Sequence, residues 1–94
     1  YNILIIWRYR GILMTNTIYA DIVEGKRDNN IKFSELQALL IRLGFECRIK
    51  GDHFIYYRHD IPEIINIQPQ GNKAKAYQIK QIRSLFNKYG IVEV

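Results

Sequence analysis

Residues 45–58 alternate between apolar and polar side chains on both sides of a turn, and this pattern constrains the fold most. The first run places apolar and charged residues in turn: Phe45, Glu46, Cys47, Arg48, Ile49 and Lys50. Gly51-Asp52 is a pair typical of a tight hairpin turn, and a second run continues from His53 to Arg58. Because alternation with a period of two puts successive side chains on opposite faces, the sequence predicts an antiparallel β-hairpin with one apolar face.

Helical patterns flank this hairpin on both sides. Before it, Ser34 is the predicted N-cap, Gln37 completes a capping box, and Gly44 is the predicted stop. A stripe of leucines at helical spacing lies between them: Leu36, Leu39, Leu40 and Leu43. After the hairpin, a second helix is predicted over residues 77–89, ending at Gly90. The apolar stripes of both helices are predicted to lie in the core.

The remaining segments complete an α+β pattern. A turn is predicted at residues 59–62, a third strand at 64–68, and a polar, basic loop at 70–75. A short helix is predicted over residues 17–24, ending at Gly25. The predicted order is therefore helix, three-stranded antiparallel meander and helix, preceded by a short helix. Two helices cover one face of such a sheet and leave the other face open.

Alternation also predicts which side chains occupy the open face. If Phe45 points toward the helices, then Arg48, Lys50, His53 and Tyr57 point away from them. His53 would then share a face with basic and aromatic groups, whereas a register shift by one residue would turn every side chain over. His59 is predicted to be an exposed residue of the next turn, not part of a metal pair.

Composition bounds the class of protein. The chain has 94 residues, enough for one small domain, and a net charge of +5. A basic balance suggests an anionic partner such as nucleic acid, although a charge of this size also serves solubility alone. The single cysteine, Cys47, excludes an internal disulfide and a cysteine-based zinc site, which fits a reducing, cytoplasmic setting. Its place in the strand pattern predicts a small buried hydrophobe.

The first residues form a separate prediction. Residues 1–16 are interpreted as an N-terminal extension, with Met14 as a possible native start, and residues 17–94 as the functional domain. The apolar run at residues 3–7 is far shorter than the roughly 20 residues that a membrane span needs. It also lacks the features of a signal peptide, so no membrane association is predicted.

Several motifs in this order resemble a known family. They are Leu43-Gly44-Phe45, Gly51-Asp52-His53, the strand that leads to Pro69, and the closing helix. Together the chain resembles the HicA family, the toxins of HicA–HicB toxin–antitoxin systems, over roughly residues 18–91. The resemblance implies a double-stranded-RNA-binding-domain-like fold of α-β-β-β-α order and ribosome-independent endoribonuclease cleavage of mRNA. It further implies a HicB-type antitoxin that covers the active site in a hetero-oligomer.

The resemblance also implies a site. His53 occupies the position of the family's active-site histidine, preceded by the turn residues Gly51 and Asp52. Histidine titrates near neutral pH and is therefore suited to take the 2′-hydroxyl proton and to protonate the leaving 5′-oxygen. Such chemistry requires neither a metal nor a cofactor. The residues predicted to contact RNA are basic or aromatic: Arg48, Lys50, Tyr57, Lys73, Lys75 and Lys80.

Two positions depart from the family pattern. Asp52 stands where the family usually has serine, and Phe54 stands where it often has a second histidine. The Asp52 carboxylate should favour the imidazolium form of His53 and repel a phosphate. An alternative interpretation therefore remains open, in which the chain is a degenerate toxin that binds RNA or a partner without catalysis.

Overall fold

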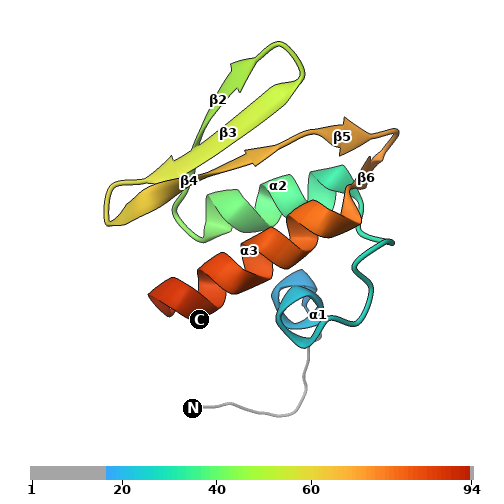
Figure 1. Ribbon diagram of the computed structural model, residues 1–94, viewed down its shortest axis with the longest axis horizontal. Coiled ribbons are helices and arrows are strands. Elements are labelled where there is room, and N and C mark those ends of the chain that lie inside the picture. Colours follow the sequence, from blue (N-terminus) through green and yellow to red (C-terminus); the bar gives the residue numbers. More distant parts are fainter. Residues whose placement is uncertain (1–16, 94) are drawn as a thin grey trace.

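The computed structural model describes residues 17–93 and has three layers. Figure 1 shows two long helices, α2 (Phe33–Arg42) and α3 (Ala76–Tyr89), beneath one face of an antiparallel sheet. The short helix α1 (Ile18–Glu24) packs against both of them on the side remote from the sheet. The predicted α+β order is confirmed. The predicted extension at residues 1–16 lies outside the described residues.

The sheet consists of β2 (Glu46–Lys50), β3 (His53–Arg58) and β4 (Ile61–Ile67), hydrogen-bonded in that order. In the β2–β3 hairpin, Lys50 lies directly opposite His53 across the Gly51-Asp52 turn. Directly opposed residues of an antiparallel pair point to the same face. The predicted hairpin and its register are therefore confirmed.

The core lies between the covered face of the sheet and the helices. The leucine stripe of α2 is buried as predicted, and it meets Tyr56 and Ile65 from the sheet. The largest fully buried side chains come from all three layers: Tyr56, Phe86, Ile22, Ile31, Leu36, Leu39, Leu40, Ile67, Ile79 and Ile82. Burying each large apolar side chain stabilises the fold by about 1.5–3 kcal/mol, which makes this cluster the main source of stability.

The predicted N-cap at Ser34 is wrong, because α2 begins earlier, with Lys32 as its N-cap. The backbone donors at the start of α2 have partners outside the helical ladder. The Phe33 N–H donates to the Asn72 carbonyl at 2.8 Å, and the Lys32 N–H donates to Glu35 Oε1 at 3.0 Å. The Leu36 N–H, which a Ser34 cap could bind, donates instead to the Lys32 carbonyl at 3.2 Å, inside the helix.

The predicted turn at residues 59–62 is too long, because Ile61 and Pro62 already belong to β4. Arg58 closes the turn early: its guanidinium donates to both carboxylate oxygens of Asp60, at 2.7 and 2.8 Å, and to the Leu43 carbonyl at 2.7 Å. Pro62 is tolerated because β4 is an edge strand. The outer side of an edge strand has no neighbouring strand, so a residue without an N–H loses no ladder hydrogen bond there.

The predicted loop at residues 70–75 contains a small hairpin instead. Strand β5 (Pro69–Gln70) pairs with β6 (Lys73–Ala74) near the N-terminal ends of α2 and α3 (Figure 1). The Ala74 N–H donates to the Ile31 carbonyl at 2.9 Å, which joins this hairpin to the segment entering α2. The local sequence is polar and predicts a loop. The hairpin depends on backbone bonds to residues distant in the sequence, which the local pattern does not show.

The tip of the β2–β3 hairpin extends beyond the helices (Figure 1). Ile49 lies on the helix side of the sheet, as its register requires, yet its surface is 65% exposed. Its predicted place on the apolar face is therefore confirmed, although this end of the strand is not covered by the helices. Cys47, nearer the helices, packs against the core as predicted, but it is half-buried where a buried side chain was predicted.

Candidate active site on the open sheet face

The open face of the sheet brings together residues from all three strands. Lys50 of β2 lies opposite His53, while Ile55 of β3 lies between Arg48 of β2 and Asn66 of β4. These residues share one face because they are directly opposed in the two ladders. The predicted grouping of His53 with basic side chains is present, and β4 adds Asn66 to it.

Both ring nitrogens of His53 have polar neighbours. Nδ1 lies 3.0 Å from Asn66 Oδ1, and Nε2 lies 3.4 Å from Gln68 Nε2. The nearer carboxylate oxygen of Asp52 lies 3.8 Å from Nε2. The side chain of His53 is 47% exposed. The imidazole is thus held in a defined orientation while one edge remains open to solvent.

Gln68 connects this histidine to its charged neighbours. Its side-chain Nε2 donates to Asp52 Oδ2 at 3.1 Å, and its Oε1 accepts from Lys75 Nζ at 3.3 Å. The Gln68 backbone N–H donates to Oε1 of the buried Gln78 at 3.2 Å. Gln78 belongs to α3, so a buried amide of the helix layer fixes the end of β4 from which Gln68 reaches the site.

The other predicted RNA contacts fall into two groups. Arg48 stacks over the Tyr57 ring, with its guanidinium carbon 5.7 Å from the ring centroid, on the same face as His53. The Tyr57 hydroxyl donates to Glu46 Oε1 at 3.4 Å. By contrast, Lys73 lies exposed in β6 and Lys80 lies on the exposed side of α3. Within residues 17–93, no described side-chain contact joins either lysine to the His53 network.

His59 is an exposed turn residue, as predicted. Its Nε2 lies 3.4 Å from Glu46 Oε2, and its ring meets Tyr57 edge to face at 6.4 Å. It lies directly after β3, at the end of that strand opposite to His53, and its neighbours are Glu46 and Tyr57. His59 is therefore a histidine of the turn between β3 and β4, and its described contacts differ from those of His53.

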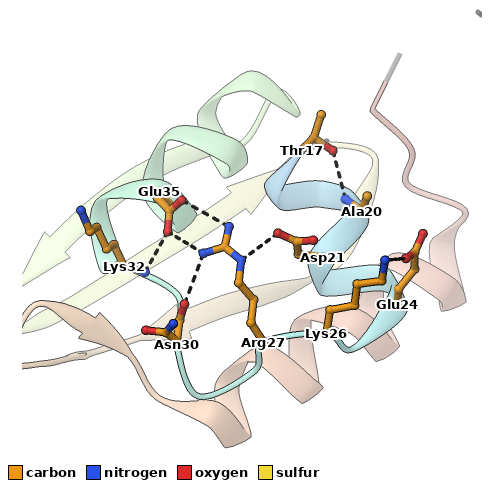
Figure 2. A network of polar contacts seen from close by, with 9 residues as sticks. All are labelled: Thr17, Ala20, Asp21, Glu24, Lys26, Arg27, Asn30, Lys32 and Glu35. Carbon is orange, nitrogen blue, oxygen red and sulfur yellow. Dashed lines mark hydrogen bonds and ion pairs between the residues drawn. The ribbon is translucent and has the colours of Figure 1, made fainter. Parts of the chain in front are cut away.

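Arg27 holds the segment between α1 and α2, on the helix side of the molecule (Figure 2). Its Nε donates to Asp21 Oδ2 at 2.7 Å, and its Nη1 donates to Glu35 Oε1 at 3.1 Å and to the Asn30 carbonyl at 3.2 Å. The hydrogen bond from Arg27 lowers the pKa of the Glu35 carboxyl below its ordinary value. The network joins α1 to the start of α2, and the next residue, Ile31, bonds to β6 just before Lys75.

A groove of about 490 Å³ runs between the edge strand β4 and α3. Its lining includes Asn66 and Gln78, which also belong to the His53 network, but not His53 itself. The histidine therefore lies beside this groove, on the flat open face. An extended polymer can reach such a face, whereas a small ligand usually binds in an enclosed pocket.

Sequence reasoning missed three residues of the network: Asn66, Gln68 and Gln78. The first two alternate with Ile65 and Ile67 in the predicted strand, so the same period of two could have placed them on the open face. No comparable signal identified Gln78, because its burial depends on how α3 packs against β4.

Two further observations concern residues 17–93 alone. In this part of the chain, no group of three or more His, Cys, Asp or Glu side chains lies close enough together to hold a metal ion. None of its helices has the length and apolar character needed to cross a bilayer.

Comparison with known protein families gives a match. A family model described as the HicA toxin of bacterial toxin–antitoxin systems matches residues 33–91. The match begins at the first residue of α2 and ends just beyond α3, so it contains every strand and the whole His53 network. No curated protein and no solved structure matches the chain significantly.

Proposed function

This chain belongs to the HicA toxin family of bacterial toxin–antitoxin systems, and on that premise we propose that it is an endoribonuclease that cleaves mRNA at His53. The observation that carries the proposal is how the His53 imidazole is held and exposed. It is held at both nitrogens, at 3.0 and 3.4 Å, and is still half-exposed on an open face. A general base needs this combination of fixed orientation and access to substrate.

The proposed reaction is internal transfer at phosphorus. His53 accepts the proton of the 2′-hydroxyl as the 2′-oxygen forms a bond to phosphorus. The bond from phosphorus to the 5′-oxygen breaks, and the imidazolium returns a proton to that oxygen. The products are a 2′,3′-cyclic phosphate and a 5′-hydroxyl, and the step uses neither a metal nor a cofactor. Acid–base assistance of this kind contributes roughly 10²–10⁴-fold to the rate.

The charges around His53 support an RNA substrate. Lys50 lies opposite the histidine, Lys75 reaches it through Gln68, and Arg48 lies on the same face. Cations in these positions stabilise the negative phosphorane and bind the flanking phosphates. Tyr57 beside Arg48 offers an aromatic surface for a base. We propose Lys73 and Lys80 as more distant phosphate contacts.

A HicB-type antitoxin is the proposed protein partner. To neutralise the toxin it would cover the open face around His53, and acidic side chains would complement Arg48 and Lys50 there. The active site would then be closed in the hetero-oligomer and open in the toxin alone. An mRNA substrate also implies action in the cytoplasm.

The two departures from the family pattern have different weight. Phe54 lies on the helix side of the sheet, where its ring meets Phe33 edge to face at 5.1 Å. Its change therefore concerns packing and not the open face. Asp52 lies in the site, 3.8 Å from His53 Nε2, and supports a second candidate function. In that candidate, the carboxylate repels the phosphate, and the domain binds RNA or a partner without cutting.

His53→Ala distinguishes the two candidates, with His59→Ala as the matched control. His53 begins β3 and His59 directly follows it, and both are exposed, but within residues 17–93 the contacts to Asn66 and Gln68 are made by His53. We expect His53→Ala to lower RNA cleavage by purified protein roughly 10²–10⁴-fold and to abolish growth arrest on induction. RNA affinity should change little, and His59→Ala should behave as wild type.

The chemical ends of the product test the reaction itself. A 2′,3′-cyclic phosphate supports histidine acid–base chemistry, whereas a 3′-hydroxyl contradicts it. If wild type and His53→Ala bind RNA equally and neither cleaves it, the non-catalytic candidate holds. Unchanged cleavage by His53→Ala would show that the site assignment is wrong.

A further inference from the structure

We propose that Lys75 and Gln68 fix the tautomer of His53, so that its Nε2 atom presents a lone pair to the substrate. In the free protein both are positioning residues: Gln68 acts through the imidazole, and Lys75 acts through Gln68. The inference rests on the proposed function, since it describes how the same histidine is prepared as a base. It follows from the donors and acceptors along one chain of contacts: Lys75, Gln68, His53 and Asn66.

The chain of contacts begins at the lysine. An ammonium group only donates hydrogen bonds, so the Gln68 atom that faces Lys75 Nζ at 3.3 Å has to be the carbonyl oxygen. The NH₂ group of Gln68 therefore points the other way, toward Asp52 and His53. The Asp52 carboxylate only accepts, and its Oδ2 lies 3.1 Å from that NH₂ group, which agrees with the same orientation.

The orientation of Gln68 decides the state of the imidazole. Its NH₂ group faces His53 Nε2 at 3.4 Å, and a donor is matched there only by a nitrogen lone pair. The neutral ring then carries its proton on Nδ1, which donates to Asn66 Oδ1 at 3.0 Å. The contact at Nε2 is longer than the usual range of about 2.7–3.2 Å, so it orients the ring without binding it tightly.

This arrangement suits a base that has to exchange partners. A weakly held lone pair is free to accept the 2′-hydroxyl proton once RNA displaces the amide of Gln68. The stronger contact, from Nδ1 to Asn66, keeps the ring in place while this occurs. Lys75, released from Gln68 by the same displacement, is then available to the phosphate. Asp52 also gains a role, since it holds the second amide hydrogen of Gln68.

The backbone supports the same arrangement. Gln68 cannot drift along the strand because its backbone N–H is held by the buried Gln78. Lys75 is the N-cap residue of α3 and follows directly after Ala74, whose N–H is bonded to Ile31. Both positioning side chains thus come from fixed points of the fold.

The test is ¹⁵N NMR of the full chain with labelled histidine, without RNA, about two units above the ordinary histidine pKa of about 6.5. We expect His53 in wild type to be predominantly the Nδ1–H tautomer. Gln68→Glu is nearly isosteric but offers an acceptor to Nε2, so the ring should shift to the Nε2–H or doubly protonated form. Asn66→Asp keeps an acceptor at Nδ1 and should retain the wild-type tautomer, whereas Asn66→Leu should lose it. His59 is the internal reference and should not change.

A predominant Nε2–H tautomer in wild type would overturn the proposal, and so would an unchanged tautomer in Gln68→Glu. If Gln68→Glu does not fold, the double variant Lys75→Met/Asp52→Ala carries the test, because Lys75 and Asp52 both orient the Gln68 amide. Without them the amide is free to turn, and His53 should give a mixture of tautomers. An unchanged pure Nδ1–H form in the double variant would contradict the proposal. The tautomer is measured without substrate, so a protein that binds RNA without cutting it still gives a clear answer. Where cleavage is measurable, Gln68→Glu should lower it by about 10²-fold.

Discussion

Replacing Arg27 by methionine removes the cation that joins α1 to the start of α2 (Figure 2). Arg27 bonds to Asp21 at 2.7 Å, to Glu35 at 3.1 Å and to the Asn30 carbonyl at 3.2 Å. The Arg27 side chain is 29% exposed and that of Asp21 18%, so this pair lies between the surface and buried limits. Exposed ion pairs contribute about 0–1 kcal/mol, and breaking a fully buried pair costs about 3–5 kcal/mol. We therefore expect Arg27→Met to lower the free energy of unfolding by about 2 kcal/mol.

The assay is urea or thermal unfolding beside a matched variant, Lys26→Met. Lys26 is the neighbouring cation and also forms an ion pair, with Glu24 at 3.0 Å, but its side chain is 66% exposed. Its replacement should leave the free energy of unfolding almost unchanged. In a domain of this size, the expected loss for Arg27→Met corresponds to a Tm lowered by roughly 8–16 °C. Equal losses in the two variants would refute the assignment of this stability to the half-buried network.

The dependence of stability on acidic pH gives a second test of Arg27→Met. Arg27 lowers the folded-state pKa of Glu35, whose ordinary value is 4.5, so the unfolded chain binds this proton more tightly than the folded protein. The resulting stabilisation is present above pH 4.5 and is lost as the pH falls through the lowered pKa. Arg27→Met should flatten this part of the curve, and Lys26→Met should leave it intact. An acid limb unaltered in Arg27→Met would contradict the proposed cause.

Two further variants probe the layers beneath the site. Burial raises the pKa of the Tyr56 phenol to about 12, so the folded protein keeps this proton more tightly and loses stability as the pH rises from about 10 toward 12. Tyr56→Phe should abolish that part of the alkaline loss in unfolding experiments, and an identical alkaline limb would count against it. Gln78→Leu leaves the Gln68 N–H without its acceptor and should cost about 1–3 kcal/mol, measured by urea unfolding. A neutral effect would mean that this amide finds another partner.

The fold was predictable where local patterns decide it. Alternation over residues 45–58 and the Gly51-Asp52 turn were sufficient for the hairpin, its register and its open face. Two features were not predictable, because backbone partners distant in the sequence set them. The start of α2 depends on the Asn72 carbonyl, and the β5–β6 hairpin depends on Ile31. No window of sequence contains both members of these pairs.

The site was predictable to a smaller extent. Alternation placed His53 among basic residues, but only the family resemblance suggested its role. Alternation also places Asn66 and Gln68 on the open face, but an uncharged amide in a strand gives no sign of a catalytic or phosphate-binding role. The distinction between Lys75, which joins the network, and Lys80, which does not, requires the packing of the layers. Charge alone ranked the two lysines equally.

The small hairpin before α3 has a consequence for how the chain can vary in length. Residues that look like a surface loop are held to the entrance of α2, by the Phe33 bond to Asn72 and the Ala74 bond to Ile31. An ordinary surface loop tolerates insertions, but an added residue here would break one of these bonds or move Lys75 away from Gln68. The contact between Lys75 and Gln68 therefore depends on a fixed number of residues between β4 and α3.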